Sequence, residues 1–165
     1  MRILGIDPGL HTCGYGCLDT DGAEMRLVEA GVVQTEARAT LPQRLCRIAA
    51  DLDQLLEDLA PDVVAIEQLY SHYAHPRTAI LMGHARGVIL QRCGARQIQI
   101  RHFTATRIKK SVTGSGRASK AQVQHTVQTL LGLPRLPEPP DVADALAAGM
   151  CCAEAMKVEK RTGRP

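Results

Sequence analysis

Residues 2–9, RILGIDPG, decide the fold, because an apolar run there ends in a carboxylate and a Pro-Gly turn. A run of this kind, bounded by turn residues, predicts a buried strand over residues 2–7. A second strand is expected near CGYGCL (13–18), and the alternation in MRLVEAGVVQT (25–35) predicts a third after the turn at 19–22. Three strands joined by short turns indicate an antiparallel meander.

A long amphipathic helix is predicted after this meander. Thr40 and Gln43 form a capping box at its start, and Pro61 ends it. Its apolar face repeats at helical spacing and consists of Leu45, Ile48, Ala49, Leu52, Leu55, Leu56 and Leu59. The continuous apolar run that follows, DVVAIE (62–67), predicts a short strand buried on both faces of a sheet.

The rest of the chain completes a mixed α/β pattern. We expect a helix from Pro76 to about Arg92 with Gly94 as its stop, a strand over 98–103, helices over 105–112 and 120–131, and a last helix from 142 to about 158. Ser119 and Gln122 form a second candidate capping box at the start of the helix over 120–131. The helical crossovers must add parallel strands, so the sheet is mixed. We expect one domain over 1–158 and a basic, frayed tail over 159–165.

The charge is unevenly distributed along the chain. Residues 68–137 contain no Asp or Glu but carry eleven Lys or Arg and five His, although the net charge of the chain is only +3. Such a tract predicts a surface that binds a polyanion, and a solvated surface with chance clustering is the alternative.

Several other classes of protein are disfavoured. No apolar run approaches the ~20 residues of a membrane span, and the N-terminus has no signal-peptide pattern, so we expect no membrane association and a cytoplasmic location. The six cysteines form no CxxC pair. His72 and His75 spell HxxH without nearby Cys or acids, so zinc is not expected there.

Four carboxylates occupy positions that favour a metal site. Asp7 and Glu67 end predicted strands, and ligands bind at the carboxyl ends of parallel strands. Asp141 and Asp144 lie three apart at the start of the last helix, so they share a face. Oxygen-only clusters suit Mg²⁺ or Mn²⁺, and two such ions activate water in phosphodiester hydrolysis.

Each carboxylate also has a structural interpretation. Asp7 is a good turn residue before Pro-Gly, and Glu67 could simply end a strand at the surface. Asp141 could be the N-cap of the last helix with Asp144 at its third position. Function is favoured by the combination, because a metal-loaded cluster beside a basic tract attracts a phosphate backbone.

Candidate nucleic-acid contacts lie in the acid-free tract. Tyr70 and Tyr73 follow Glu67 closely, and aromatic side chains stack on bases; packing over the sheet edge is the alternative. The loop TGSGRAS (113–119) is typical of a mobile phosphate-contacting loop or a plain linker. The basic residues around it are Lys109, Lys110, Arg117 and Lys120.

Five blocks of the sequence carry a family resemblance. ILGIDPG, AIEQLY, GHARGV, IKKSVTGSGRASKAQVQ and PPDVADALA resemble, in order and spacing, the RuvC family of Holliday junction resolvases. The resemblance implies an RNase H-like fold with a five-stranded mixed sheet flanked by helices, a homodimer, and RuvA and RuvB as partners. It also implies a metal-dependent endonuclease, using Mg²⁺ or Mn²⁺ with two ions per active site, that nicks two strands of a four-way DNA junction.

The resemblance carries specific residue roles onto this chain. The catalytic, metal-binding acids are Asp7, Glu67, Asp141 and Asp144, and some relatives have His where Asp141 stands. Lys109 and Lys120 correspond to family lysines of the basic loop. Tyr70 corresponds to the aromatic that engages junction bases.

Some alternatives stay open at this point. Gly83 and Gly87 could let their helix approach a dimer mate or pack on the protein's own sheet. A ribonuclease H would share the fold and acids but cut RNA-DNA hybrids, and a junction-binding protein without catalysis is also conceivable. A sugar kinase or Hsp70-like ATPase shares the first strand-turn pattern but needs two such domains, which 165 residues cannot supply.

Overall fold

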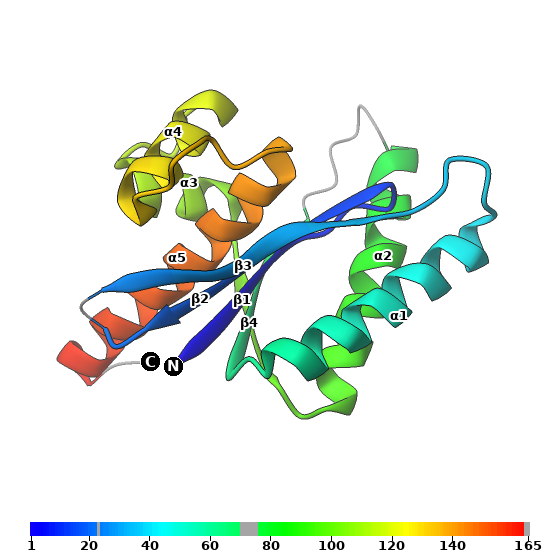
Figure 1. The fold of residues 1–165 in the computed structure, drawn as a ribbon, viewed down its shortest axis with the longest axis horizontal. Helices are drawn as coiled ribbons and strands as arrows, with labels where there is room; N and C mark the ends of the chain where they lie inside the picture. Colours follow the sequence, from blue (N-terminus) through cyan, green and yellow to red (C-terminus); the bar gives the residue numbers. More distant parts are fainter. Residues whose placement is uncertain (23, 70–75, 164–165) are drawn as a thin grey trace.

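Five strands form one mixed sheet in the order β3-β2-β1-β4-β5 (Figure 1). The computed structural model describes residues 1–22, 24–69 and 76–163. The strands are β1 (Arg2–Asp7), β2 (Thr12–Thr20), β3 (Met25–Gln34), β4 (Val63–Glu67) and β5 (Gln99–Phe103). The first three are antiparallel, whereas β4 runs parallel to β1 and β5 parallel to β4. The meander and the mixed sheet are therefore confirmed.

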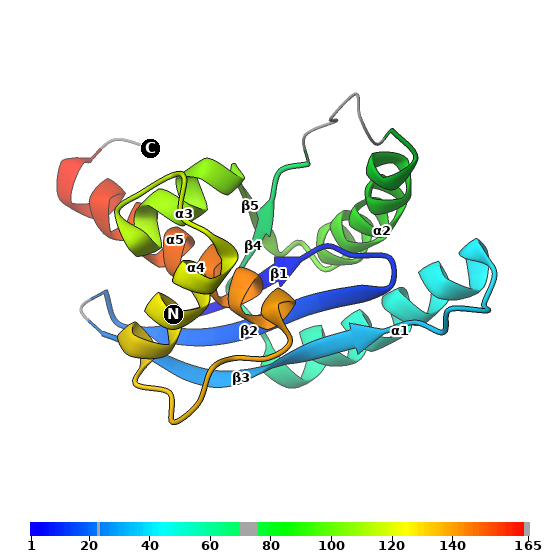
Figure 2. The same cartoon turned by 90° about the horizontal axis from the view of Figure 1, so that it is seen from above.

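Helices cover both faces of this sheet (Figures 1 and 2). They are α1 (Leu41–Leu59), α2 (Pro76–Ala95), α3 (Ala105–Thr113), α4 (Lys120–Leu131) and α5 (Pro140–Thr162). Alternate residues of β1 belong to different cores: Leu4 and Ile6 pack with α1 and α2, and Ile3 packs with the three later helices. This alternation is the period-2 pattern of a strand buried on both faces.

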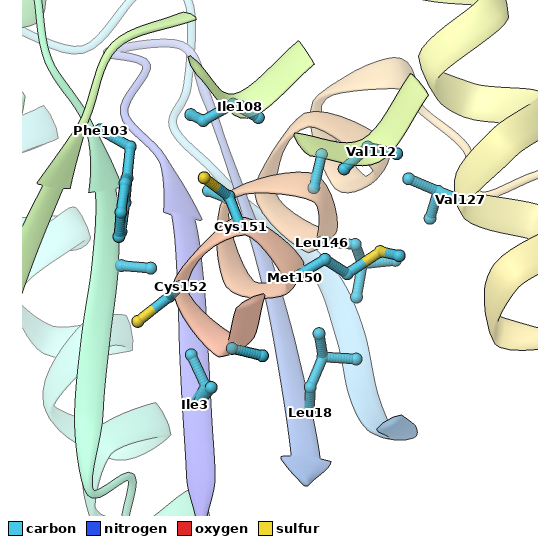
Figure 3. Packing of buried hydrophobic residues seen from close by; sticks show 14 of the residues in the cluster. Ile3, Leu18, Phe103, Ile108, Val112, Val127, Leu146, Met150, Cys151 and Cys152 are labelled. Atoms are coloured by element: carbon cyan, nitrogen blue, oxygen red, sulfur yellow. The ribbon is translucent and has the colours of Figure 1, made fainter. Parts of the chain in front are cut away.

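The helix α5 lies in the core that Figure 3 shows, between the sheet and the helices α3 and α4. Leu146 and Met150 pack there with Leu18 of β2, while Val112 and Val127 of α3 and α4 cover the other side. Because α5 is apolar on nearly all sides of its middle turns, it is a buried helix rather than an amphipathic surface helix.

Both predicted capping boxes form. The N–H of Thr40 donates to Oε1 of Gln43 at 2.9 Å at the start of α1. At the start of α4, the Ser119 N–H donates to Gln122 Oε1 at 2.8 Å and the Gln122 N–H donates to Ser119 Oγ at 3.2 Å. These bonds satisfy N–H groups that a helix start leaves without intrahelical partners.

Two helix boundaries differ from expectation. The helix α2 continues past Gly94 to Ala95, and Gln97 adopts the left-handed conformation with φ 56° instead. The helix α5 extends to Thr162, where Gly163 caps it, so residues 159–162 are helical. An ion pair between Arg101 of β5 and Glu159 ties this last part of α5 to the sheet.

No helix among the described residues is long and apolar enough to cross a membrane.

Candidate active site

Two carboxylates lie at the ends of neighbouring parallel strands. The register pairs Ile6 of β1 with Ile66 of β4, so Asp7 and Glu67 follow at the same edge of the sheet. The N–H of Gln68 donates to the carbonyl oxygen of Phe103 at 2.8 Å, which continues the pairing of β4 with β5 beyond Glu67. The first and fourth strands are thus direct neighbours in the sheet.

The start of α5 brings two more carboxylates to this edge. Gly14 of β2 pairs with Asp7 across the sheet, and a Cβ at Gly14 would overlap the carbonyl oxygen of Asp141. The missing side chain lets the first turn of α5 lie directly on β2 beside Asp7. Asp144 follows one turn later on the same helix.

Asp141 does not cap this helix. The N-cap is Pro139, Pro140 begins the helix, and no side chain makes a cap hydrogen bond. Asp141 lies within the first turn, where the helix dipole still favours a negative charge. The N-cap interpretation is therefore wrong, and the carboxylate is left available to the pocket.

All four carboxylates line one pocket of about 650 Å³. Lys109 of α3 and Lys120 of α4 line the same pocket. The structure thus brings together the acids and two of the predicted basic residues.

The other predicted nucleic-acid contacts lie elsewhere. Lys110 lines a separate hollow between α3 and α5, and Arg117 is exposed. Tyr70, Tyr73, His72 and His75 lie outside the described residues. Gly114 caps α3 with φ 79° and Gly116 packs closely against Thr106, so both glycines of the TGSGRAS loop have conformational or packing roles.

Burial and mutual repulsion disfavour full ionisation of the carboxylates. The pKa of Asp7 is raised to about 7, first by burial and then by the charges of Asp144, Glu67 and Asp141 in that order. Burial also raises the pKa of Glu67, followed by the effect of Asp144, while Lys120 and Lys109 oppose the shift. Such a cluster is stabilised by a cation that enters it.

Lys120 supplies part of the positive charge that compensates the carboxylates in this structure. Lys120 Nζ donates to Asp144 Oδ2 at 2.9 Å, and this bond is the main cause of the raised pKa of Lys120. In the described part of the chain, no group of three or more His, Cys, Asp or Glu side chains is already arranged around a common metal position. The oxygen-only donor set nevertheless fits hard divalent cations, provided that the Asp144 carboxylate exchanges Lys120 for the ion.

Sequence reasoning missed an arginine behind Glu67. Arg86 of α2 donates from Nε to the carbonyl oxygen of Glu67 at 3.2 Å, and its Nη2 lies 2.8 Å from Nδ1 of His102 on β5. Burial lowers the pKa of Arg86. Arg86 stands in the GHARGV block, but it was counted only as one base of the acid-free tract. His102 was likewise counted only as one of the five histidines of that tract.

Two further basic residues line the pocket without having been predicted. His11 follows the Pro-Gly turn, and Arg44 lies in the first turns of α1. Neither falls in the acid-free tract, because both belong to the acidic first part of the sequence. Only the fold brings them to the carboxylates.

The mixed sheet with acids at the ends of β1 and β4 and on the last helix defines the RNase H-like class of nucleases. The model of the family described as crossover junction endodeoxyribonuclease RuvC matches residues 3–152. The chain belongs to the RuvC family, which makes it a crossover junction endodeoxyribonuclease.

Individual relatives agree over nearly their whole length. The RuvC of Rhodopirellula baltica is 49% identical over 149 residues, which cover 90% of this chain and 84% of the relative. The RuvC of Alkaliphilus oremlandii is 42% identical over 153 residues, 93% of each chain. These similarities favour the resolvase interpretation over ribonuclease H and over the ATPase alternatives.

Solved structures show the same fold. The Thermus thermophilus RuvC in complex with Holliday junction substrate is 30% identical with a TM-score of 0.89, covering 96% of both chains. The yeast mitochondrial Holliday junction resolvase Ydc2 is 13% identical with a TM-score of 0.67, covering 98% of this chain and 82% of its own, which shows the fold alone. The RNase H-like fold is confirmed.

Proposed function

We propose that this protein resolves four-way DNA junctions by nicking two strands of like polarity symmetrically, in recombination and DNA repair. The observation that carries the proposal is the single pocket in which four carboxylates and two lysines meet, in a chain of the RuvC family. A carboxylate cluster alone repels DNA, whereas the same cluster with divalent cations and flanking lysines binds a phosphate.

The proposed roles of the acids follow from the elements that hold them. Asp7 and Glu67 sit on paired strands and keep their oxygens fixed, and Asp141 and Asp144 complete the set from α5. The four carboxylates would hold two Mg²⁺ or Mn²⁺ ions, which would neutralise the cluster and supply an activated water for hydrolysis of the scissile phosphodiester bond. Lys120, once exchanged from Asp144, is then available with Lys109 to bind the phosphate.

The remaining predicted contacts belong to the junction rather than to the pocket. Tyr70 follows Glu67 by three residues, so a base stacked on it would lie close to the reacting strand. Lys110 and Arg117 are exposed on and after α3 and contribute positive charge along the DNA.

A homodimer would supply the two active sites that paired nicks require. Gly83 and Gly87 are exposed, and a Cβ at either would meet no atom of the described residues within 4 Å, so these glycines do not pack on the protein's own sheet. The exposed side of α2 therefore supports the alternative in which the helix approaches a second copy. RuvA and RuvB are proposed partners on the resemblance alone, and a cytoplasmic location agrees with six cysteines that are all free thiols.

The test is incubation of the protein with an end-labelled mobile four-way junction, with and without Mg²⁺, and mapping of nicks on all four strands. We expect metal-dependent nicks at symmetric positions in one pair of like strands. An RNA-DNA hybrid in parallel separates this activity from ribonuclease H, and binding without nicks would indicate a non-catalytic protein.

Glu67→Gln tests the role of the carboxylates directly. The change keeps the size of the side chain but removes a charged ligand, so cleavage should fall by roughly a thousandfold or more while junction binding persists. Gel-shift and single-turnover measurements on the same preparation check this. Unchanged turnover would rule out Glu67 as a metal ligand.

A further inference from the structure

The catalytic pocket is basic on two sides that come from opposite layers of the fold. Lys109 and Lys120 reach it from α3 and α4, on the face of the sheet that α5 covers. Arg44 reaches it from α1, on the other face. The two layers flank the sheet in Figure 1. Asp7 and Glu67 are the last residues of β1 and β4, which lie side by side in that sheet.

Arg44 is held in a way that leaves its guanidinium available. Its Nε donates to the carbonyl oxygen of Glu36 at 3.0 Å, which fixes the side chain against the segment before α1. Within residues 1–22, 24–69 and 76–163, no carboxylate forms an ion pair with Arg44. Arg47, one turn further along the same helix, is paired with Asp51 at 2.7 Å. A guanidinium anchored at Nε and half-buried in a pocket retains its two terminal nitrogens for an anion.

His11 lines the same pocket as this arginine, and its backbone is held in place. The N–H of Thr35 donates to the carbonyl oxygen of His11 at 3.0 Å, and Thr35 Oγ1 donates to the carbonyl oxygen of Leu10 at 2.7 Å. Thr35 is only 5% exposed, so these bonds are sheltered from water. The turn after Asp7 is thereby preorganised, and the His11 side chain is exposed at its surface.

We propose that Arg44, assisted by His11, binds a second phosphate of the cleaved strand, on the opposite side of the nick from the phosphate bound by Lys109 and Lys120. The proposal rests on the proposed junction cleavage and gives the path of the cleaved strand. This strand would cross the carboxyl ends of β1 and β4, from the layer of α3 and α4 to the layer of α1. Contacts with phosphates on both sides of the nick would hold the scissile phosphate over the carboxylates. The terminal nitrogens of an anchored arginine match the geometry of phosphate oxygens. Arg44 is thus a DNA-binding and positioning residue.

The first measurement is the salt dependence of binding to a four-way junction in Ca²⁺, after Mg²⁺-dependent nicking by the wild type has been established. Loss of one phosphate contact lowers the slope of log K against log salt by about one. We expect the slope for Arg44→Gln to be smaller than that of the wild type by about one, and its affinity for the junction to be about tenfold lower. The matched control is Arg47→Gln, which removes the same charge from the same helix outside the pocket and should bind as the wild type does.

The second measurement locates the phosphate. A set of junctions is prepared, each with one neutral methylphosphonate at a different position of the cut strand. The affinity of the wild type should fall for those junctions in which the substituted phosphate is one that the protein contacts. We expect Arg44→Gln to be insensitive at one position on one side of the nick, and Lys109→Gln at a position on the other side. Arg44→Lys should restore much of the salt slope but not the full cleavage rate, because lysine lacks the fixed fork of nitrogens.

Two outcomes would overturn the proposal: a salt slope for Arg44→Gln equal to that of the wild type, or insensitivity of Arg44→Gln and Lys109→Gln on the same side of the nick. An unfolding temperature of Arg44→Gln within a degree or two of that of the wild type shows that the segment around Glu36 has kept its structure. His11→Gln is a second variant, and it leaves the hydrogen bond between Arg44 and Glu36 intact. Wild-type protein that neither binds nor nicks junctions would contradict the proposed function instead, so the two failures are distinguishable.

Discussion

Asp7 is a residue whose buried carboxyl serves the proposed chemistry but lowers the stability of the fold at neutral pH. Its pKa rises from the ordinary 3.8 to about 7, first because of burial and then because of the neighbouring carboxylates. A carboxyl with a raised pKa in the folded state contributes stability that is fully present below about pH 4. That contribution is lost as the pH rises through about 7. At neutral pH and above, the metal-free protein is therefore expected to be less stable than at pH 5.

Asp7→Asn should remove most of this pH dependence. Without metal, the variant is expected to be more stable than the wild type at pH 8, by an amount on the order of a few kcal/mol, and similar to it near pH 4. Chemical unfolding in a chelating buffer at pH 5 and pH 8 measures the difference, and added Mg²⁺ should narrow it by stabilising only the wild type. Equal losses of stability between the two pH values in both proteins would contradict the predicted ionisation of Asp7.

Other residues show where sequence patterns reach their limit. Glu67 could be placed at a strand end because its strand is a continuous apolar run between turn residues. Asp141 could not be separated from an N-cap, since the preceding prolines give no sign of which residue starts the helix; the structure gives that position to Pro139. Arg44 and Arg86 stood out by no local pattern. Arg44 matters because the fold places it in the pocket of the carboxylates, and Arg86 because it contacts the carbonyl oxygen of Glu67 from another element.

At the scale of elements, the sequence predicts best those helices that have one apolar face. The stripe of α1 and the capping box of α4 placed both helices closely. The ends of α5 were misplaced, because a helix buried on nearly all sides has no periodicity that marks its limits. Gly94 was taken as a helix stop although it lies in open space inside α2, where a glycine costs helix stability without ending the helix.

The contact between β1 and α5 depends on a glycine that the sequence does not single out. A Cβ on Gly5 would overlap the carbonyl oxygen of Ala145 and lie 2.8 Å from the backbone nitrogen of Gly149. Both obstacles are backbone atoms, which cannot rotate away. This close approach fixes α5, and with it Asp141 and Asp144, at its height on the sheet.

Gly5→Ala should therefore destabilise the protein by about 1–3 kcal/mol, towards the upper end of the range for overpacked sites. Gly94→Ala is the matched control: it adds the same methyl group in open space and should be neutral or stabilising by up to about 1 kcal/mol. Urea denaturation of the three proteins measures both effects. A midpoint for Gly5→Ala equal to that of the wild type would mean that α5 can shift on β1 at little cost.

At the scale of the whole molecule, the described residues cover α2 on only one side. Of its twenty residues only Ala85, Ile89 and Cys93 are buried, and Ile80 is 61% exposed. Its inner side holds Arg86 against the carbonyl oxygen of Glu67. The same helix therefore joins the active site to the surface that the proposed dimer would use, which would place both catalytic centres in a fixed relation to one two-fold axis.

The double change of Gly83 and Gly87 to Arg tests this arrangement. No atom of the described residues lies within 4 Å of a Cβ at either position, so the variant should fold, but long charged side chains would hold two copies apart. Sedimentation equilibrium should show a dimer for the wild type and a monomer for the variant, and the variant should lose coordinated nicking by tenfold or more. Gly94→Arg, in open space on the same helix, should remain dimeric and active. If the variant still dimerises, the two-fold axis does not lie at this side of α2. A wild type that stays monomeric while making paired nicks would refute the dimer itself.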